Sequence, residues 1–251
     1  MERRQYLGAA AAGGVVGVAG VSAYTVLGSG GNDGPPAMVE AEFPPYPNSE
    51  TIERSGSGTG TSEPFELVNE GPTIIDTNVD HSSDDIYNVE LRSTTDETVR
   101  GVIQARGPFT GRTNVQPVDP GSYELSVLNA SGDWEATIYD LPVYEVGTGM
   151  EPPFAFADGL DTVVGPIDFG EQSPVEFVFE VDKDSRHRLD LVDRTGAVQE
   201  SLVQASTAGS RSALRAIGGV GYLDLKSFTT WTLEVIPRTG GVGGNTTNES
   251  N

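Results

Sequence analysis

Two acidic turns hold the side chains of this chain that are best suited to binding a cation. The candidate ligands are five aspartates: Asp80, Asp84, Asp85, Asp182 and Asp184. Calcium takes several oxygen ligands from one tight loop, so each turn is a candidate calcium site. Neither turn has the glycine and final glutamate of an EF-hand loop, and Lys183 lies inside the second turn. Ordinary solvated turns on an acidic surface are therefore the alternative interpretation.

The other residues that could do chemistry do not form a recognisable catalytic pattern. The two histidines, His81 and His187, lie in different halves of the chain and lack the helical spacing of a zinc site. No Gly-x-Ser-x-Gly nucleophile motif and no phosphate-binding Gly-x-x-x-x-Gly-Lys loop occurs. We therefore predict a protein that is not an enzyme and that has no cofactor other than the candidate calcium. A secreted hydrolase is the least favoured alternative.

The two tryptophans, Trp134 and Trp231, could be platforms on which sugar rings stack. Each is followed, two and four positions later, by apolar residues that share its face of a β-strand: Ala136 and Ile138, and Leu233 and Val235. This spacing favours core packing. A carbohydrate-binding module remains an alternative function, beside the calcium-binding one.

The segments that contain these tryptophans are the clearest part of an internal duplication. GSYELSVLNASGDWEATIY, which starts at Gly121, corresponds to GVGYLDLKSFTTWTLEVI, which starts at Gly219. Corresponding pairs include Phe65 with Ile167, Pro72 with Pro174, Val89 with Leu189, Leu91 with Leu191, Leu125 with Leu223 and Trp134 with Trp231. One pair does not fit, because this alignment sets Tyr222 opposite Glu124 instead of Tyr123.

Both halves show short segments of alternating apolar and polar residues, which are typical of antiparallel strands with one buried face. The strands of the first half are predicted near residues 64–68, 73–79, 86–92, 98–105, 113–118, 121–128 and 134–140. Those of the second half are predicted near 163–169, 175–181, 187–193, 197–204, 211–217, 220–226 and 230–236. We predict an all-β fold with two tandem antiparallel β-sandwiches, either immunoglobulin-like or jelly-roll-like.

The predicted domain boundaries follow changes in composition along the chain. They are a signal or anchor at 1–27, a flexible Gly/Ser/Pro linker at 28–62, a first sandwich at 63–142, a linker at 143–158, a second sandwich at 159–238 and a disordered tail at 239–251.

The charge of the chain excludes one class of partner. Asp and Glu number 37 against 15 Lys and Arg, a net charge of −22. Such a surface repels phosphate backbones, so nucleic acid is not expected as a partner. The chain also has no cysteine, so no disulfide or thiolate metal site is present. This acid-rich, lysine-poor, cysteine-free composition resembles that of proteins from extremely halophilic archaea.

The N-terminal segment resembles a twin-arginine export signal, because Arg3 and Arg4 are followed by Gln, Tyr and Leu and then by a mildly apolar run. The resemblance implies export of a folded chain. Whether the segment is cleaved or stays as an anchor is open, so we expect membrane contact only through an uncleaved segment. Three sequons, at Asn129, Asn245 and Asn248, are candidate N-glycosylation sites.

With its duplicated GSYELSV…GDW hairpin, the chain is similar to exported haloarchaeal proteins with tandem β-sandwich domains. That resemblance is structural and implies no reaction. We expect a non-catalytic protein, secreted or anchored at the cell surface, with a structural or partner-binding role. The expected partner is an extracellular protein or a glycan.

Overall fold

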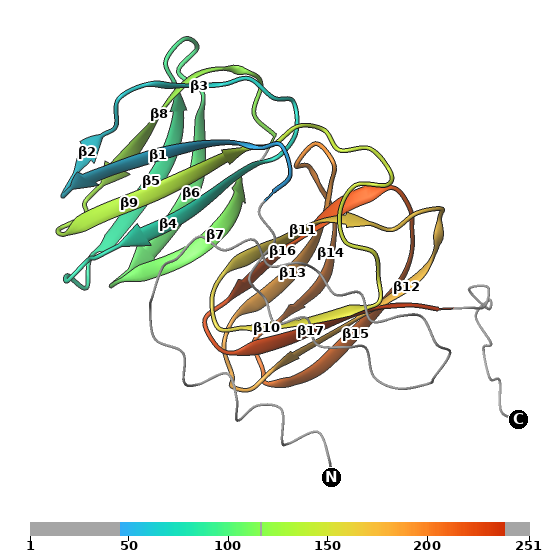
Figure 1. Cartoon of the computed structure of the whole chain (residues 1–251). Helices are drawn as coiled ribbons and strands as arrows, with labels where there is room; N and C mark the ends of the chain where they lie inside the picture. Colours follow the sequence, from blue (N-terminus) through green and yellow to red (C-terminus); the bar gives the residue numbers. More distant parts are fainter. Residues whose placement is uncertain (1–45, 116, 239–251) are drawn as a thin grey trace, which may run out of the picture.

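The fold was obtained as a computed structural model, which describes residues 46–115 and 117–238. Within these residues the regular secondary structure consists of β-strands, which form two domains, β1–β9 and β10–β17 (Figure 1). In this part of the chain no helix is long and apolar enough to cross a membrane.

The first domain is a sandwich of two antiparallel sheets. One sheet has the order β1 (Glu50–Ser57), β9 (Asp133–Asp140), β4 (Thr73–Val79) and β7 (Phe109–Val115). The other has the order β2 (Gly60–Thr61), β8 (Gly121–Leu128), β5 (Ile86–Ser93) and β6 (Val99–Arg106), and β3 (Phe65–Leu67) also pairs with β8.

The second domain repeats this arrangement. One of its sheets has the order β10 (Phe154–Asp158), β17 (Trp231–Pro237), β12 (Ser173–Val181) and β15 (Gly209–Ile217). The other has the order β11 (Thr162–Asp168), β16 (Val220–Ser227), β13 (His187–Asp193) and β14 (Val198–Ala205). In both domains the first strand pairs with the last, β1 with β9 and β10 with β17. The last strand also pairs with β4 in the first domain and with β12 in the second. This strand order is that of a jelly roll. The predicted tandem sandwiches are confirmed, and the jelly-roll alternative is the correct one.

The ladders also place the duplicated residues in equivalent positions. Trp134 lies opposite Val79, and Trp231 lies opposite Val181. The apolar residues of each alternating segment fill one core per domain, because their shared face turns toward the opposite sheet.

Two predicted linkers were wrong in part. Strands β1 and β2 lie inside 28–62, where they pair with β9 and β8, and β10 lies inside 143–158, where it pairs with β17. Strand β7 also begins at Phe109, earlier than predicted. Strand β1 is mostly exposed and carries little apolar alternation, because an edge strand is held chiefly by backbone pairing. The sequence pattern therefore could not reveal it.

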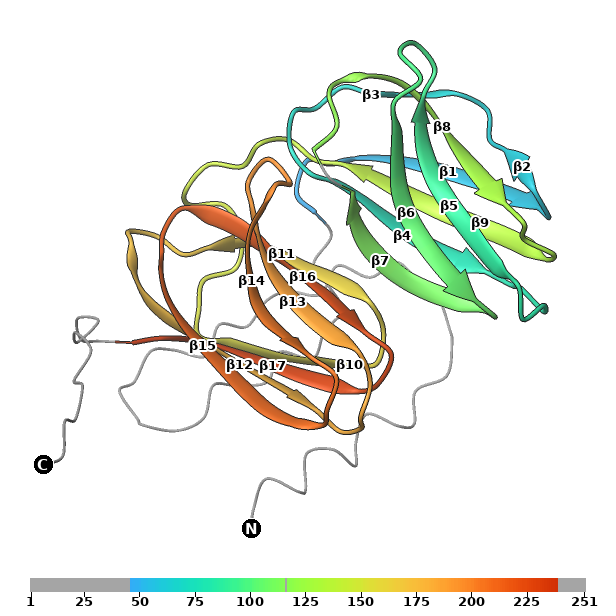
Figure 2. The ribbon, with the colours of Figure 1, turned by 180° about the vertical axis from the view of Figure 1, so that it is seen from behind.

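A third apolar cluster lies between the domains. It consists of Tyr46, Ile74, Leu141, Tyr144, Val163, Val192, Val220 and Tyr222. Figures 1 and 2 both show β7 as the strand of the first domain nearest to the second, beside β11.

Candidate functional site

The first acidic turn is joined to the β8–β9 turn by His81, which is 1% exposed. Its Nδ1 accepts a hydrogen bond from the Ser131 backbone N–H at 3.1 Å, and Ser131 Oγ lies 3.2 Å from the same nitrogen. Because Nδ1 is an acceptor here, Nε2 carries the proton and donates it to the Asp85 carbonyl at 3.1 Å. The ring also packs on Tyr87, with centroids 4.7 Å apart. His81 therefore connects two turns, and its contacts are structural.

The aspartates predicted as calcium ligands are not brought together by the fold. Asp182 accepts a hydrogen bond from Thr229 Oγ1, and Asp184 accepts one from the Ala208 N–H at 2.8 Å. In the first turn Asp85 accepts one from Ser83 Oγ at 3.0 Å, while Asp80 and Asp84 are exposed. Within residues 46–115 and 117–238, no group of three or more His, Asp and Glu side chains is placed to hold a metal ion. Three of these carboxylates therefore stabilise loops.

Both tryptophans are buried, with exposed fractions of 3% for Trp134 and 1% for Trp231. Trp231 Nε1 donates to the Leu160 carbonyl at 3.1 Å, which fixes the β10–β11 turn to the core. Core packing, the favoured interpretation, is confirmed, and the sugar-stacking one was wrong for these two rings.

His187 is buried as well, at the start of β13. Its Nδ1 lies 2.9 Å from the Ser185 carbonyl, and its ring lies beside Phe179, with centroids 5.6 Å apart. It faces the sandwich core, away from any open surface.

Among the sequence-predicted modification and export residues, the structure describes only Asn129. It is exposed in the β8–β9 turn with φ of 61°, two residues before Ser131. Arg3, Arg4, Asn245 and Asn248 lie outside the described residues.

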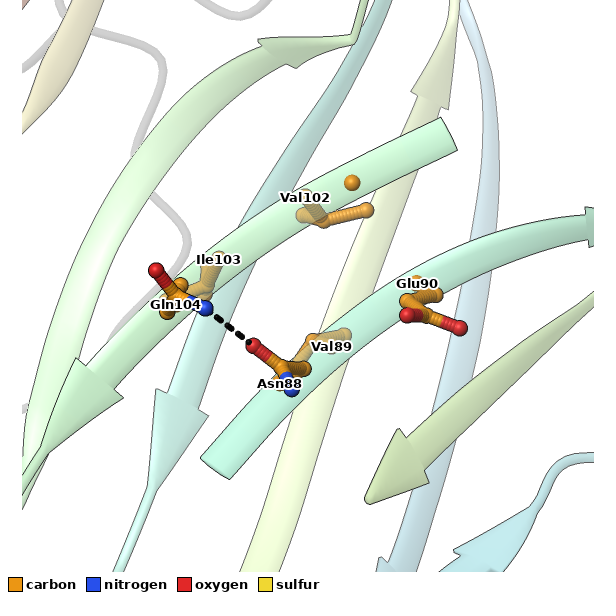
Figure 3. A pocket seen from close by; sticks show the side chains of 7 residues that line it. Asn88, Val89, Glu90, Val102, Ile103 and Gln104 are labelled. Carbon is orange, nitrogen blue, oxygen red and sulfur yellow. Dashed lines mark hydrogen bonds between the residues drawn. The ribbon is translucent and has the colours of Figure 1, made fainter. Parts of the chain in front are cut away.

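A shallow hollow of about 420 Å³ lies on the outer face of β5 and β6 (Figure 3). It occurs where the register of the two strands shifts between Val89 and Glu90, so that Val102 of β6 is the extra residue of a bulge. At its edge Gln104 Nε2 donates to Asn88 Oδ1 at 3.1 Å. Glu90 is turned along the strand, where it forms an ion pair with Arg92 at 2.8 Å. The hollow is open, its lining is about equally polar and apolar, and it could receive hydrogen-bonding groups of a partner.

The most unusual set of ionisable side chains lies at the domain interface. Three aspartates come together on the side of the β11–β16–β13–β14 sheet that faces the first domain: Asp161, Asp190 and Asp224. Asp190 and Asp224 lie opposite each other in the ladder, with exposed fractions of 4% and 5%. Asp161, in the β10–β11 turn, accepts a hydrogen bond from the Ser227 N–H at 2.7 Å.

Two cations lie among these carboxylates. Arg188 Nε lies 2.7 Å from the Asp190 carboxylate, and Lys226 Nζ lies 3.3 Å from Asp224 Oδ1. The second pair is an ion pair without an aligned hydrogen bond, so Asp224 Oδ1 has no hydrogen-bond partner among the described residues. Burial raises the pKa of Asp224 to about 6, although Lys226 favours its ionised form. Burial also raises the pKa of the Asp161 carboxyl.

Polar contacts connect this cluster to the first domain. Lys226 Nζ donates to Thr113 Oγ1 at 3.1 Å, and the Arg112 N–H donates to the Asp161 carbonyl at 2.8 Å. Nearby, Asn114 Nδ2 donates to the Gly196 carbonyl at 3.0 Å. These bonds fix β7, the edge strand of its sheet, against the second domain.

Sequence reasoning missed this cluster, because Asp190 and Asp224 stand on strand faces that were taken to be solvated. One signal was available: Tyr222 departs from the phase of its counterpart Tyr123. A large apolar ring on the outer face of a strand indicates that something covers that face.

The chain matches no protein-family model, and no curated protein matches it.

Proposed function

We propose that this protein is a non-catalytic module, secreted or held at the cell surface of a halophile, with a structural role. In this role the two jelly rolls act as one stiff unit. The segment at 28–45, predicted from its composition to be part of a flexible linker, would tether that unit to the N-terminal segment.

The observation that supports a structural role is the domain interface. Its apolar cluster draws residues from the first domain, from the connecting segment and from the second domain. Tyr46 Oη donates to the Val163 carbonyl at 3.3 Å, and Tyr144 Oη donates to the Pro47 carbonyl. Domains joined only by a flexible linker would not need such a buried and hydrogen-bonded contact.

Calorimetry of the exported chain in molar salt tests the stiff unit. We expect one cooperative transition, because unfolding of either domain exposes the shared cluster. Tyr222→Ala should split it into two transitions, since it removes a buried ring from the interface at a cost of about 3 kcal/mol. Two separate transitions in the unaltered protein would contradict the proposal.

Cell fractionation tests the location. The tagged chain should be found in the medium or the cell envelope, and the double variant Arg3→Lys, Arg4→Lys should be retained in the cytoplasm. Equal export of both proteins would contradict export through a twin-arginine signal at Arg3 and Arg4.

A second candidate function, binding of a glycan or an extracellular protein, is favoured by the open hollow on β5 and β6, which has the amides of Asn88 and Gln104 at its edge. Glycan-array binding that disappears in the double variant Asn88→Ala, Gln104→Ala would support it. Binding that survives in that variant would place the ligand elsewhere.

A further inference from the structure

The charges gathered at the domain interface do not balance. The carboxylates of Asp161, Asp190 and Asp224 outnumber the cations beside them, Lys226 and Arg188, by one. An uncompensated charge in a poorly hydrated site is costly, whereas a neutral carboxyl group is much less so. Uptake of one proton would bring this cluster to balance.

The cluster belongs to the interface and not to the second domain alone. Asp224 lies on β16 between Tyr222, which packs in the interdomain cluster, and Lys226, which bonds Thr113 of the first domain. Asp161 contributes its carboxylate to the second domain and its carbonyl to the first.

We propose that this aspartate cluster makes the contact between the two domains pH-dependent, so that the domains hold each other more tightly in mildly acidic than in alkaline surroundings. The inference rests on the proposed stiff two-domain unit and adds a condition under which the unit loosens.

The direction follows from the charged groups that face Asp224. These are Lys226 on its own strand, Asp190 and Arg188 on β13, and Asp161 in the β10–β11 turn. On β7 the facing side chain is the uncharged Thr113, since the Arg112 guanidinium pairs with Asp76. His187 on β13 faces the core. Burial raises the pKa of the Tyr222 and Tyr46 hydroxyls, so neither ionises between pH 5 and pH 8.

A carboxyl whose pKa is raised in the closed state binds its proton more tightly there than in the open state. The closed state is therefore favoured as the pH falls through about 6, and this gain is complete near the ordinary aspartate pKa of 3.8. Between pH 8 and pH 5 the ratio of closed to open molecules should rise about tenfold.

Native-state hydrogen exchange of the full exported chain, in molar salt, tests this. The probe is the Arg112 amide, whose hydrogen bond to Asp161 crosses the interface. After correction for the intrinsic exchange rate, its opening constant should be about tenfold larger at pH 8 than at pH 5. The Phe177 amide, within the second domain's core ladder, should show no such change.

Asp224→Asn should remove the pH dependence and protect the Arg112 amide at pH 8. The control Glu180→Gln removes an exposed charge from the outer face of β12 and should behave like the unaltered protein. Should Asp224→Asn fail to fold, Asp190→Asn serves in its place. An equal opening constant at both pH values would overturn the inference, as would unchanged pH dependence in Asp224→Asn. An Arg112 amide without protection at either pH would instead contradict the stiff unit itself.

Discussion

At the residue scale, two tyrosines show how the duplicated domains diverged. Tyr123 points into the rim of the first core, and its hydroxyl donates to the Asp119 carbonyl at 2.7 Å. Tyr222 stands one position out of phase with it, on the outer face of β16, where it is fully buried in the cluster between the domains. The out-of-phase tyrosine is therefore an interface residue that has no counterpart in the first domain.

These tyrosines give a matched pair of variants. The Tyr222 hydroxyl has no hydrogen-bond partner among the described residues, so Tyr222→Phe should raise the free energy of unfolding by about 1 kcal/mol. Tyr123→Phe loses a hydrogen bond and should lower it by up to about 1 kcal/mol. Denaturant titrations of both variants in the same salt would check the opposite signs. A Tyr222→Phe variant that is less stable than the parent would show that the hydroxyl is paired.

At the element scale, the outer faces of the two equivalent sheets differ in kind. Where the second domain has Tyr222 and Val192, the first has Glu124 and Arg92, according to the equivalence of Leu125 with Leu223 and of Leu91 with Leu191. The second domain's face is covered by β7 and its neighbours, whereas in Figure 2 no strand of the described residues lies over the outer face of β5 and β6. The apolar side chains at these two positions give the second domain's face an apolar patch that the first domain's face lacks, which explains why only this face serves as a domain contact.

The close contact between the β4–β5 and β8–β9 turns provides another test. A Cβ atom at Gly132 would lie 1.6 Å from the Asp80 carbonyl oxygen, so the two turns can meet only at a glycine. Gly132→Ala should cost about 2 kcal/mol or more of stability, because backbone must move to relieve the clash. Gly101→Ala is the control, since a Cβ there meets nothing within 4 Å, and it should change stability by no more than about 0.5 kcal/mol. Thermal melts would rank the two variants, and equal stability would show that the turns separate easily.

At the scale of the whole molecule, the main feature is the net charge of −22. Like charges on a compact surface oppose folding, and the range of their repulsion falls from about 10 Å in 0.1 M salt to about 3 Å in 1 M salt. The three carboxylates gathered at the interface all belong to the second domain, so their mutual repulsion acts within that domain.

We therefore expect the melting temperature to rise steeply with sodium chloride up to about 1 M. Sucrose, which stabilises by exclusion from the surface without screening charge, should give a smaller and more gradual rise. Differential scanning calorimetry would measure both. A melting temperature that does not respond to salt would mean that the acidic surface does not limit stability.

Much of this fold could be predicted because it depends on neighbours in sequence. The alternation in Val175, Phe177, Phe179 and Val181 places these side chains on one face of a strand, whatever the rest of the chain does. The same spacing predicted that Trp134 and Trp231 are core residues.

By itself, then, the sequence determined the all-β class, the duplication and the buried faces, since these follow from local alternation. The tertiary structure decided the jelly-roll order, the edge strands β1 and β10, and the meeting of Asp161, Asp190 and Asp224 with Lys226. The physical reason is that strand order, edge pairing and domain contact depend on which distant segments meet. A solvent-exposed strand face and a face covered by another domain can show the same alternation of residues. The sequence pattern alone therefore does not distinguish them.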